Sequence, residues 1–234
     1  MSVKAKRTQK RDPAAILNNI WKDTVENPGG TIKFARDAEN KFIWWVLICG
    51  IRNPKSETES GIRGPKDEFI GAEFLVKMEM DKNDPHTKPP KFWLKTPNCV
   101  YKLDERPCIG IGEYHSDDFL AGLGPRGFAY EIANGINSYP ELGGGLNLVY
   151  GKYSPDQMQE CARNSAKYNW EHNREIMQIM KIQYDKNLSK WLKKYPDDYK
   201  TPELAGKFRN EEVRRNAELS PTYLDELEWD PERA

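Results

Sequence analysis

The side chains best suited to chemistry gather in one irregular stretch, residues 96–123. It contains Asn98, Cys108, His115 and Asp117. A loop cysteine can reach a substrate, its thiolate is a nucleophile, and a side-chain amide can donate a hydrogen bond to an oxyanion. A Cys-His-Asp hydrolase is disfavoured, because residues only two apart, as His115 and Asp117 are, rarely orient one another. The residues alone leave open whether a cysteine of this stretch is a nucleophile or a packed side chain.

The four cysteines occupy different contexts. Cys49 lies in a run of tryptophan and aliphatic residues, and Cys161 lies among alanine and methionine in a helical stretch, so both are expected to pack in the core. Cys99 and Cys108 lie in the irregular stretch and are the two candidate nucleophiles. There is no CxxC pair and the histidines are scattered, so we expect neither a zinc site nor any other cofactor.

The composition excludes several classes of function. The 234 residues carry 36 Lys+Arg and 36 Asp+Glu, and this zero net charge argues against a nucleic-acid-binding protein. The longest apolar run, residues 42–49, is far shorter than the roughly 20 residues of a membrane helix. Only 38% of the residues are hydrophobic, so a compact core accompanied by polar segments is expected. The basic amino terminus lacks an apolar signal core, which favours a reducing compartment.

The first half of the chain predicts one helix and four strands. Residues 1–11 form a basic, polar leader that we expect to be disordered. Asp12-Pro13 is a cap followed by proline at the first helical position, and it predicts a helix over residues 13–26. Short aromatic and β-branched segments then predict an antiparallel meander. Its strands are expected at residues 31–34, 42–49, 73–80 and 92–94.

Helices dominate the second half. After the irregular stretch, apolar residues at four-residue spacing predict a helix over residues 127–139. The triple glycine at 143–145 is a flexible turn rather than a phosphate loop, because no GKS or GKT follows it. Ser154-Pro155-Asp156 predicts the start of a long helical stretch that reaches about residue 194. Residues 53–67 are predicted to form a polar surface loop.

The order of these segments resembles the ubiquitin-conjugating enzymes. Phe69-Ile70-Gly71-Ala72-Glu73-Phe74 is similar to that family's Tyr-Glu-Gly-Gly-x-Phe, and Lys88-Pro89-Pro90 is similar to its Pro-Pro pair before the last strand. Thr96-Pro97-Asn98 is followed ten residues later by Cys108-Ile109-Gly110-Ile111. The resemblance covers about residues 12–170 and is closest to the branch anchored in the endoplasmic reticulum. In that branch Thr-Pro-Asn replaces His-Pro-Asn.

The resemblance implies an α+β fold, the ubiquitin-conjugating-enzyme fold. It has an amino-terminal helix, a four-stranded antiparallel meander, an active-site loop and carboxyl-terminal helices, here with an extended helical tail. It implies that Cys108 carries ubiquitin or a ubiquitin-like protein as a thioester. Asn98 would stabilise the oxyanion directly or by holding the loop, Asp117 would orient or desolvate the attacking lysine, and His115 would pack. The implied partners are an activating enzyme, a ubiquitin ligase and protein substrates.

Two departures from the family change the expectations. Phe119-Leu120-Ala121-Gly122 lacks the proline of the turn with which the family helps to bind ligases. The anchored branch ends in a membrane helix, whereas this chain ends in charged residues, so we expect a soluble enzyme of the cytoplasm or nucleus with no membrane partner. The expected organisation is a leader (1–11), a catalytic domain (12–170) and a carboxyl-terminal extension (171–234).

Two other interpretations stay open. An inactive variant of the same fold could hold ubiquitin or another partner without catalysis. Alternatively, the tail over residues 185–234 could be the functional part, since it carries several aromatic residues. That tail could dock on its own domain or on an external partner.

Overall fold

The structure is a computed structural model that describes residues 12–25, 32–49, 69, 72–109, 119, 124–137, 149 and 152–183. Its elements are α1 (Pro13–Val25), β1 (Ile32–Arg36), β2 (Ile43–Cys49), β3 (Glu73–Glu79), β4 (Lys91–Leu94), α2 (Gly124–Asn137) and α3 (Pro155–His172). Residues 174–183 are again helical. The predicted α+β class is confirmed. The leader 1–11, the polar loop 53–67, the triple glycine and the tail beyond residue 183 lie outside the described residues.

The four strands form one antiparallel sheet in the order β1-β2-β3-β4, as the meander prediction requires. The register places Trp44 of β2 opposite Arg36 of β1 and Met78 of β3. On the other side of β3, Met78 lies opposite Phe92 of β4. Each strand begins or ends within two residues of its predicted position.

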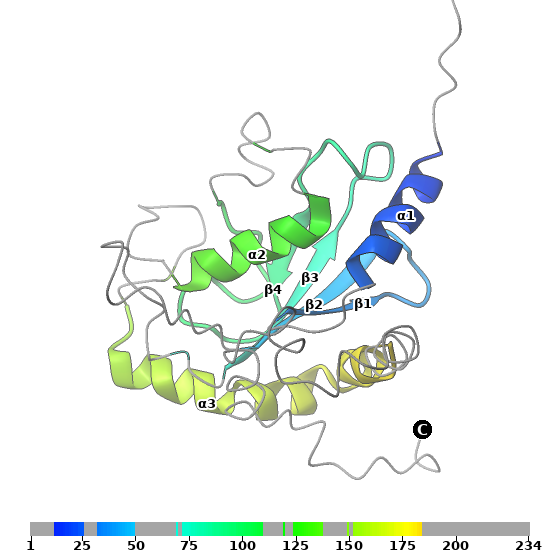
Figure 1. Cartoon of the computed structure of the whole chain (residues 1–234). Coiled ribbons are helices and arrows are strands. Elements are labelled where there is room, and N and C mark those ends of the chain that lie inside the picture. The colour runs from blue at the N-terminus through cyan, green and yellow to red at the C-terminus, as the bar shows by residue number, and fades with distance from the viewer. Residues whose placement is uncertain are drawn as a thin grey trace, which may run out of the picture.

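One face of the sheet packs against α1 and α2 (Figure 1). Trp44, the second residue of β2, is fully buried, and its ring meets Trp21 of α1 edge-on at 4.8 Å between ring centroids. From α2, Phe128 meets Phe92 of β4 edge-on at 5.8 Å. Such edge-to-face pairs stabilise a core beyond the area they bury. This face carries the main hydrophobic core.

The opposite face is covered by residues that follow α3. Met177 and Met180 are buried there against Trp45, Leu47 and Leu75. In Figure 1 the sheet accordingly lies between α2 and the α3 segment. Because both of its faces are covered, β2 is apolar along its whole length instead of alternating. Glu73 at the start of β3 is buried as well, where Ser165 and Asn169 of α3 bond to its backbone.

The helix starts follow from local sequence. Ser154 caps α3: its Oγ accepts from the Gln157 N–H at 3.3 Å, and the Gln157 Oε1 accepts from the Ser154 N–H at 2.9 Å. This reciprocal pair, with Pro155 in the first turn, is the start that the sequence predicted. Helix α2 begins three residues earlier than predicted, because Pro125 suits a first helical turn.

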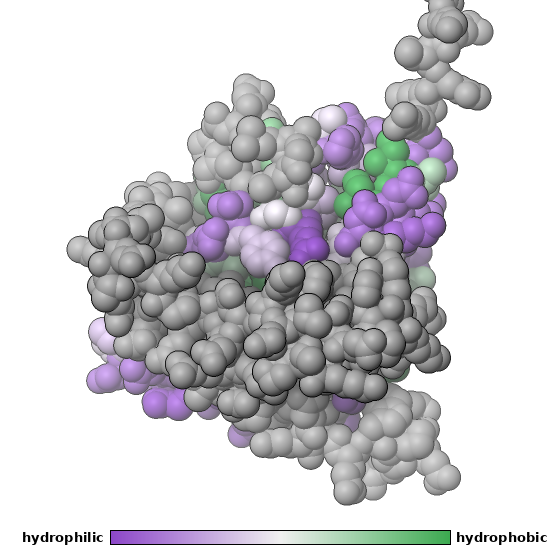
Figure 2. Space-filling model, viewed as in Figure 1, coloured by the Kyte–Doolittle hydropathy of each residue, from purple (hydrophilic) through white to green (hydrophobic). Residues whose placement is uncertain are grey.

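The surface seen in Figure 2 is mostly hydrophilic where it belongs to described residues, with a small apolar patch over α1. None of the described helices is both long enough and apolar enough to span a membrane.

Candidate functional site

A buried asparagine closes the turn that begins the irregular stretch. Asn98 is 0% exposed, and its Oδ1 accepts from the N–H groups of Val100 at 3.0 Å and Tyr101 at 2.7 Å. Its Nδ2 donates to the carbonyls of Thr96 at 3.1 Å and Tyr101 at 3.3 Å. These four bonds use both donors and both lone pairs of the amide. In this conformation Asn98 therefore holds the loop and has no spare donor for an oxyanion.

The turn is fastened to the sheet and to α3 through Thr96. The Thr96 Oγ1 accepts from the Leu75 N–H of β3 at 2.8 Å and donates to the Asn169 Oδ1 of α3. The Asn169 Nδ2 in turn donates to the Glu73 carbonyl at 2.8 Å. Thr96 and Asn169 are both fully buried. Because buried polar groups are costly unless bonded, this network fixes where the turn lies relative to the helix.

A second polar contact joins α3 to β3. Ser165 Oγ accepts from the Glu73 N–H at 2.7 Å and donates to the Ala162 carbonyl of its own helix at 2.6 Å. Thus the first residue of β3 gives both of its backbone groups to α3. Sequence reasoning missed Asn169 as a buried residue. The signal was available, because Asn169 continues the helical spacing of Met158, Ala162 and Ser165, which are buried on the same helix.

Cys108 is partly exposed and lies near a buried tyrosine hydroxyl. Burial raises the pKa of Tyr101, and the negative charge of the Cys108 thiolate raises it further. The Tyr101 ring is 2% exposed and meets Phe92 edge-on at 6.1 Å. Its hydroxyl has no hydrogen-bond partner within the described part of the chain. Tyr101 therefore links the two: its backbone bonds to Asn98, and its hydroxyl lies near Cys108.

The other loop cysteine, Cys99, belongs to the turn itself. It has a φ of 59°, a left-handed conformation that favours glycine or asparagine, and it is 9% exposed. Interaction with the Cys161 thiol of α3 lowers the pKa of Cys99, and Cys161 packs against the core as expected. The Cys161 Sγ also donates to the Pro97 carbonyl at 3.0 Å. Cys49 is buried on β2, also as predicted, and none of the four cysteines forms a disulfide.

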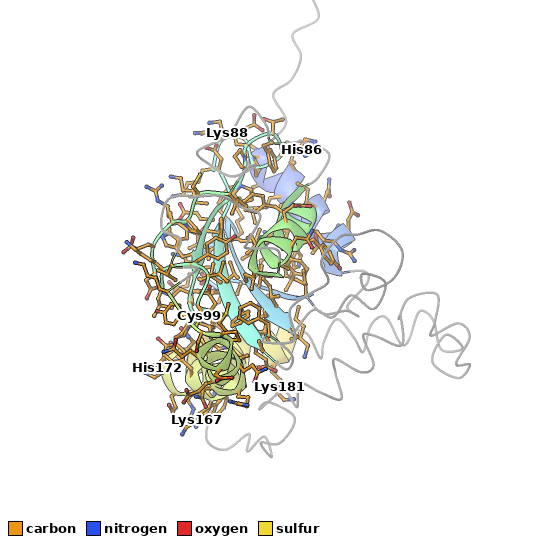
Figure 3. The ribbon with its side chains drawn as sticks, turned by 90° about the vertical axis from the view of Figure 1, so that its left-hand side faces the viewer. His86, Lys88, Cys99, Lys167, His172 and Lys181 are labelled. Carbon is orange, nitrogen blue, oxygen red and sulfur yellow. The ribbon has the colours of Figure 1, made fainter. Side chains whose placement is uncertain are left out.

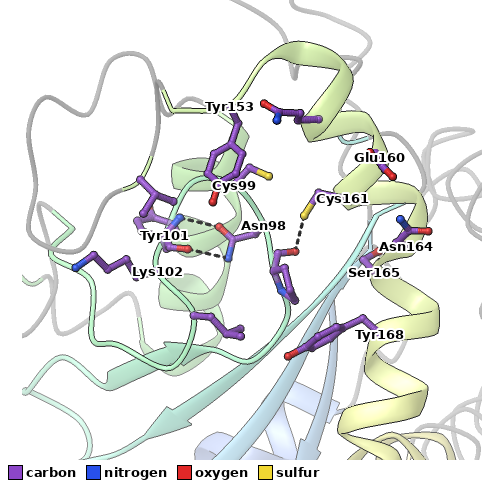
Figure 4. Close-up of a pocket in the computed structure, with 14 residues that line it drawn as sticks. Asn98, Cys99, Tyr101, Lys102, Tyr153, Glu160, Cys161, Asn164, Ser165 and Tyr168 are labelled. Atoms are coloured by element: carbon purple, nitrogen blue, oxygen red, sulfur yellow. Dashed lines mark hydrogen bonds between the residues drawn. The ribbon is translucent and has the colours of Figure 1, made fainter.

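A pocket of about 530 Å³ opens between the Asn98 turn and α3 (Figure 4). The turn contributes Asn98 and Cys99, and α3 contributes Cys161 and Tyr168. Figure 3 places Cys99 beside α3, at the opposite end of the molecule from His86 and Lys88 in the β3–β4 connection. The described residues include no group of three or more His, Cys, Asp or Glu that could hold a metal ion.

The structure brings together only part of the predicted constellation. Asn98 and Cys108 are described, whereas Asp117 and His115 lie outside the described residues. Phe119, from the turn that departs from the family pattern, is buried and packs edge-on against Phe128 at 6.1 Å. Phe119 is therefore anchored to α2.

Comparison with known proteins places the chain near one family. It is 25% identical over 166 residues to a protein named ubiquitin-conjugating enzyme E2 6 from Candida glabrata, covering 70% of this chain and 57% of that protein. It is 29% identical over 114 residues to ubiquitin-conjugating enzyme E2 32 from Arabidopsis thaliana, covering 47% of this chain and 32% of that protein. The chain is thus similar, at low identity, to ubiquitin-conjugating enzymes E2. It spans 57% and 32% of the length of these two curated relatives.

Ubiquitin-conjugating enzymes also occur among the solved structures that match. One is the crystal structure of a ubiquitin-conjugating enzyme E2 from Plasmodium falciparum, with a TM-score of 0.40 and 19% identity over 59% of this chain and 95% of that chain. Another is described as a novel ubiquitin-conjugating enzyme, with a TM-score of 0.44 and 16% identity over 76% of this chain and 99% of that chain. No protein-family model matches the chain.

Proposed function

We propose that this protein is an active ubiquitin-conjugating-type transferase that carries ubiquitin or a ubiquitin-like protein as a thioester on Cys108. The observation that carries the proposal is the position of Cys108. It is a partly exposed thiol in the segment that follows the buried Asn98 turn, in a chain related to ubiquitin-conjugating enzymes. The Thr-Pro-Asn motif supports assignment to the branch anchored in the endoplasmic reticulum.

In the first step the Cys108 thiolate attacks the thioester that an activating enzyme has made with the carboxyl terminus of the carried protein. A new thioester forms on Cys108, and the thiolate of the activating enzyme leaves. A lysine amine of a substrate, or the cysteine of a ligase, then attacks the Cys108 thioester and releases the Cys108 thiolate. Each attack passes through an oxyanion.

Asn98 serves this chemistry by holding the loop. Both of its amide hydrogens are already donated to the carbonyls of Thr96 and Tyr101. The turn therefore gives the Cys108 segment a fixed starting point, which limits the cost of ordering the site during the reaction. We assign to Asp117 the role of orienting or desolvating the attacking lysine.

The proposed partners are the carried ubiquitin-like protein, its activating enzyme, a ubiquitin ligase and protein substrates. We place the enzyme in the cytoplasm or nucleus. The four thiols, none of which is in a disulfide, support a reducing compartment.

The test is a charging assay. The full chain is incubated with activating enzyme, ATP and ubiquitin, and the products are separated without and with a thiol reductant. We expect an adduct of the two proteins that the reductant removes. The adduct should be lost in Cys108→Ala and kept in Cys99→Ala, which is the matched control within the same irregular stretch.

Each other outcome decides against part of the proposal. An adduct that persists in Cys108→Ala and disappears in Cys99→Ala would move the nucleophile to Cys99. A chain that binds ubiquitin but is never charged would be the inactive binding variant. In Cys108→Ser, a hydroxyl nucleophile should give an ester that survives the reductant, which separates loss of the thiol from loss of the fold.

A further inference from the structure

Two thiols meet beside the Asn98 turn. Cys99 on the turn and Cys161 on α3 both line the pocket, and Figure 4 shows their side chains directed toward one another. The Cys161 Sγ also lies 3.0 Å from the carbonyl oxygen of Pro97, two residues before Cys99. The helix and the turn therefore touch at the Cys161 sulfur, beside Cys99.

Neither cysteine is explained by packing alone. Cys99 takes a left-handed conformation, with a φ of 59°, in which a side chain is strained and glycine is favoured. Strained backbone positions of this kind concentrate at functional sites. Cys161 is only partly buried and faces the pocket. Cys49, by comparison, is buried among the apolar side chains of the second sheet face.

We propose that Cys99 and Cys161 form a reversible dithiol–disulfide pair that is oxidised by peroxide and links the Asn98 turn to α3. The Cys99 thiolate attacks one oxygen of hydrogen peroxide, so that an S–O bond forms, the O–O bond breaks and hydroxide leaves. The Cys161 sulfur then displaces the hydroxyl group of the Cys99 sulfenic acid, and an S–S bond forms. In total, two thiols lose two electrons and two protons, and one peroxide becomes two waters.

The environment of the pair assigns the two roles. Interaction with the Cys161 thiol lowers the pKa of Cys99, so Cys99 is the attacking sulfur. The same interaction, together with burial, raises the pKa of Cys161, which therefore acts as the resolving thiol. The pocket provides the access that a small oxidant needs. This chemistry does not use Cys108 and does not depend on the proposed transferase activity.

The disulfide would have a defined mechanical effect. It would join residues 62 positions apart in the chain and tie the turn closed by Asn98 to α3 by a covalent bond. Opening of the turn away from the helix would then be suppressed. The N–H groups of Val100 and Tyr101 donate to the Asn98 Oδ1. We expect hydrogen exchange at these two amides to slow by about tenfold or more in the oxidised protein.

The sequence makes the bond easy to locate. Cleavage after lysine and arginine places the four cysteines in four separate peptides, namely 42–52, 96–102, 103–126 and 153–163. We would treat the full chain carrying Cys108→Ser with hydrogen peroxide, block the remaining thiols and digest it without reductant. The expected product is peptide 96–102 linked to peptide 153–163 with the loss of two hydrogen atoms. A thiol reductant should separate the two peptides.

Matched variants make the result decisive. Cys49→Ala should leave the linked pair unchanged, whereas Cys161→Ala should abolish it and leave Cys99 as a sulfenic acid that a dimedone probe traps. Recovery of both peptides with blocked, unoxidised thiols would overturn the proposal, as would a link from either peptide to the Cys49 peptide. Unchanged exchange at Val100 and Tyr101 in the linked protein would overturn the mechanical part.

Discussion

Two turns of this protein are closed by the same device in opposite surroundings. Asp37 follows β1, and its Oδ1 accepts hydrogen bonds from the N–H groups of Glu39 at 3.1 Å and Asn40 at 2.9 Å. The Asn98 Oδ1 likewise accepts from the residues two and three positions after it. The Asp37 turn is partly exposed, whereas Asn98 is fully buried. An exposed turn tolerates a carboxylate, because water solvates its charge. A buried turn needs a neutral amide.

The second polar atom of each side chain shows the same difference. The Asn98 Nδ2 donates to two backbone carbonyls, which would repel a second oxygen. The Asp37 Oδ2 instead accepts from the Trp45 Nε1 at 3.3 Å. Asparagine and aspartate are nearly the same shape, so exchanging them tests chemistry with little change in volume.

The largest effect is expected for Asn98→Asp. The new carboxylate would be buried against the Thr96 and Tyr101 carbonyls, and we expect a loss of roughly 3–5 kcal/mol in the free energy of unfolding at pH 7. Burial raises the folded-state pKa of such a carboxyl above its unfolded value, so the penalty grows as pH rises above about 4. Urea unfolding at pH 7 and pH 4 measures both quantities. A loss that is the same at the two pH values would contradict this account.

A smaller loss is expected when the buried turn is detached from α3. Asn169→Ala removes the donor to the Glu73 carbonyl and the acceptor for Thr96, and should cost about 1–3 kcal/mol. Gln183→Ala is the matched variant near the exposed turn, because Gln183 pairs with the N–H and carbonyl of Arg36 at 2.8 and 2.7 Å. Since Gln183 is partly exposed, its loss should cost less. Urea denaturation of the two variants side by side checks the order.

The reverse exchange, Asp37→Asn, should cost about 1 kcal/mol or less at pH 7, because the amide oxygen still accepts the turn N–H groups. Desolvation acts to raise the pKa of Asp37, but hydrogen bonds from Asn40, Trp45 and Glu39 outweigh it and lower the pKa. The stabilisation from this depressed pKa is present above the unfolded value of about 3.8 and is lost as pH falls through the folded value. The difference between wild type and variant should therefore shrink below about pH 4, which unfolding curves at several pH values will show.

The smallest effect is expected for Tyr101→Phe. Asn98 bonds to the backbone of Tyr101, and the Tyr101 hydroxyl lacks a partner within the described residues. Removing an unpartnered buried hydroxyl should leave the free energy of unfolding within about 0.5 kcal/mol of wild type, or raise it. Thermal unfolding of the variant checks this. A loss above about 1 kcal/mol would mean that the hydroxyl contributes to the fold.

Sequence patterns predicted the local elements well, because each has a local cause. The cap at Ser154, the proline that follows it and the alternation of Phe74, Val76 and Met78 act within a few residues. The antiparallel meander was predicted from its short aromatic and β-branched segments. The start of α2 was misplaced by three residues because the pattern of apolar residues begins after Pro125.

Contacts between distant segments were not predictable from these patterns. Burial of Glu73 depends on Ser165 and Asn169, more than ninety residues later in the chain. Asn98 uses both of its donors only once the turn is closed. Cys99 lies beside Cys161 only because α3 packs against the turn. The order of motifs in the sequence was enough to propose the nucleophile. Only the tertiary structure shows which residues surround it.

The cover on the second face of the sheet has a consequence for biosynthesis. Met177 and Met180 follow the last strand residue, Leu94, by 83 and 86 positions, so the ribosome completes the sheet well before it makes this cover. At about 5–20 residues per second, the delay is roughly 4–17 s. During that interval Trp45, Leu47 and Leu75 have no helix to pack against. The nascent chain thus presents an apolar surface on which a chaperone can act before the last helix docks.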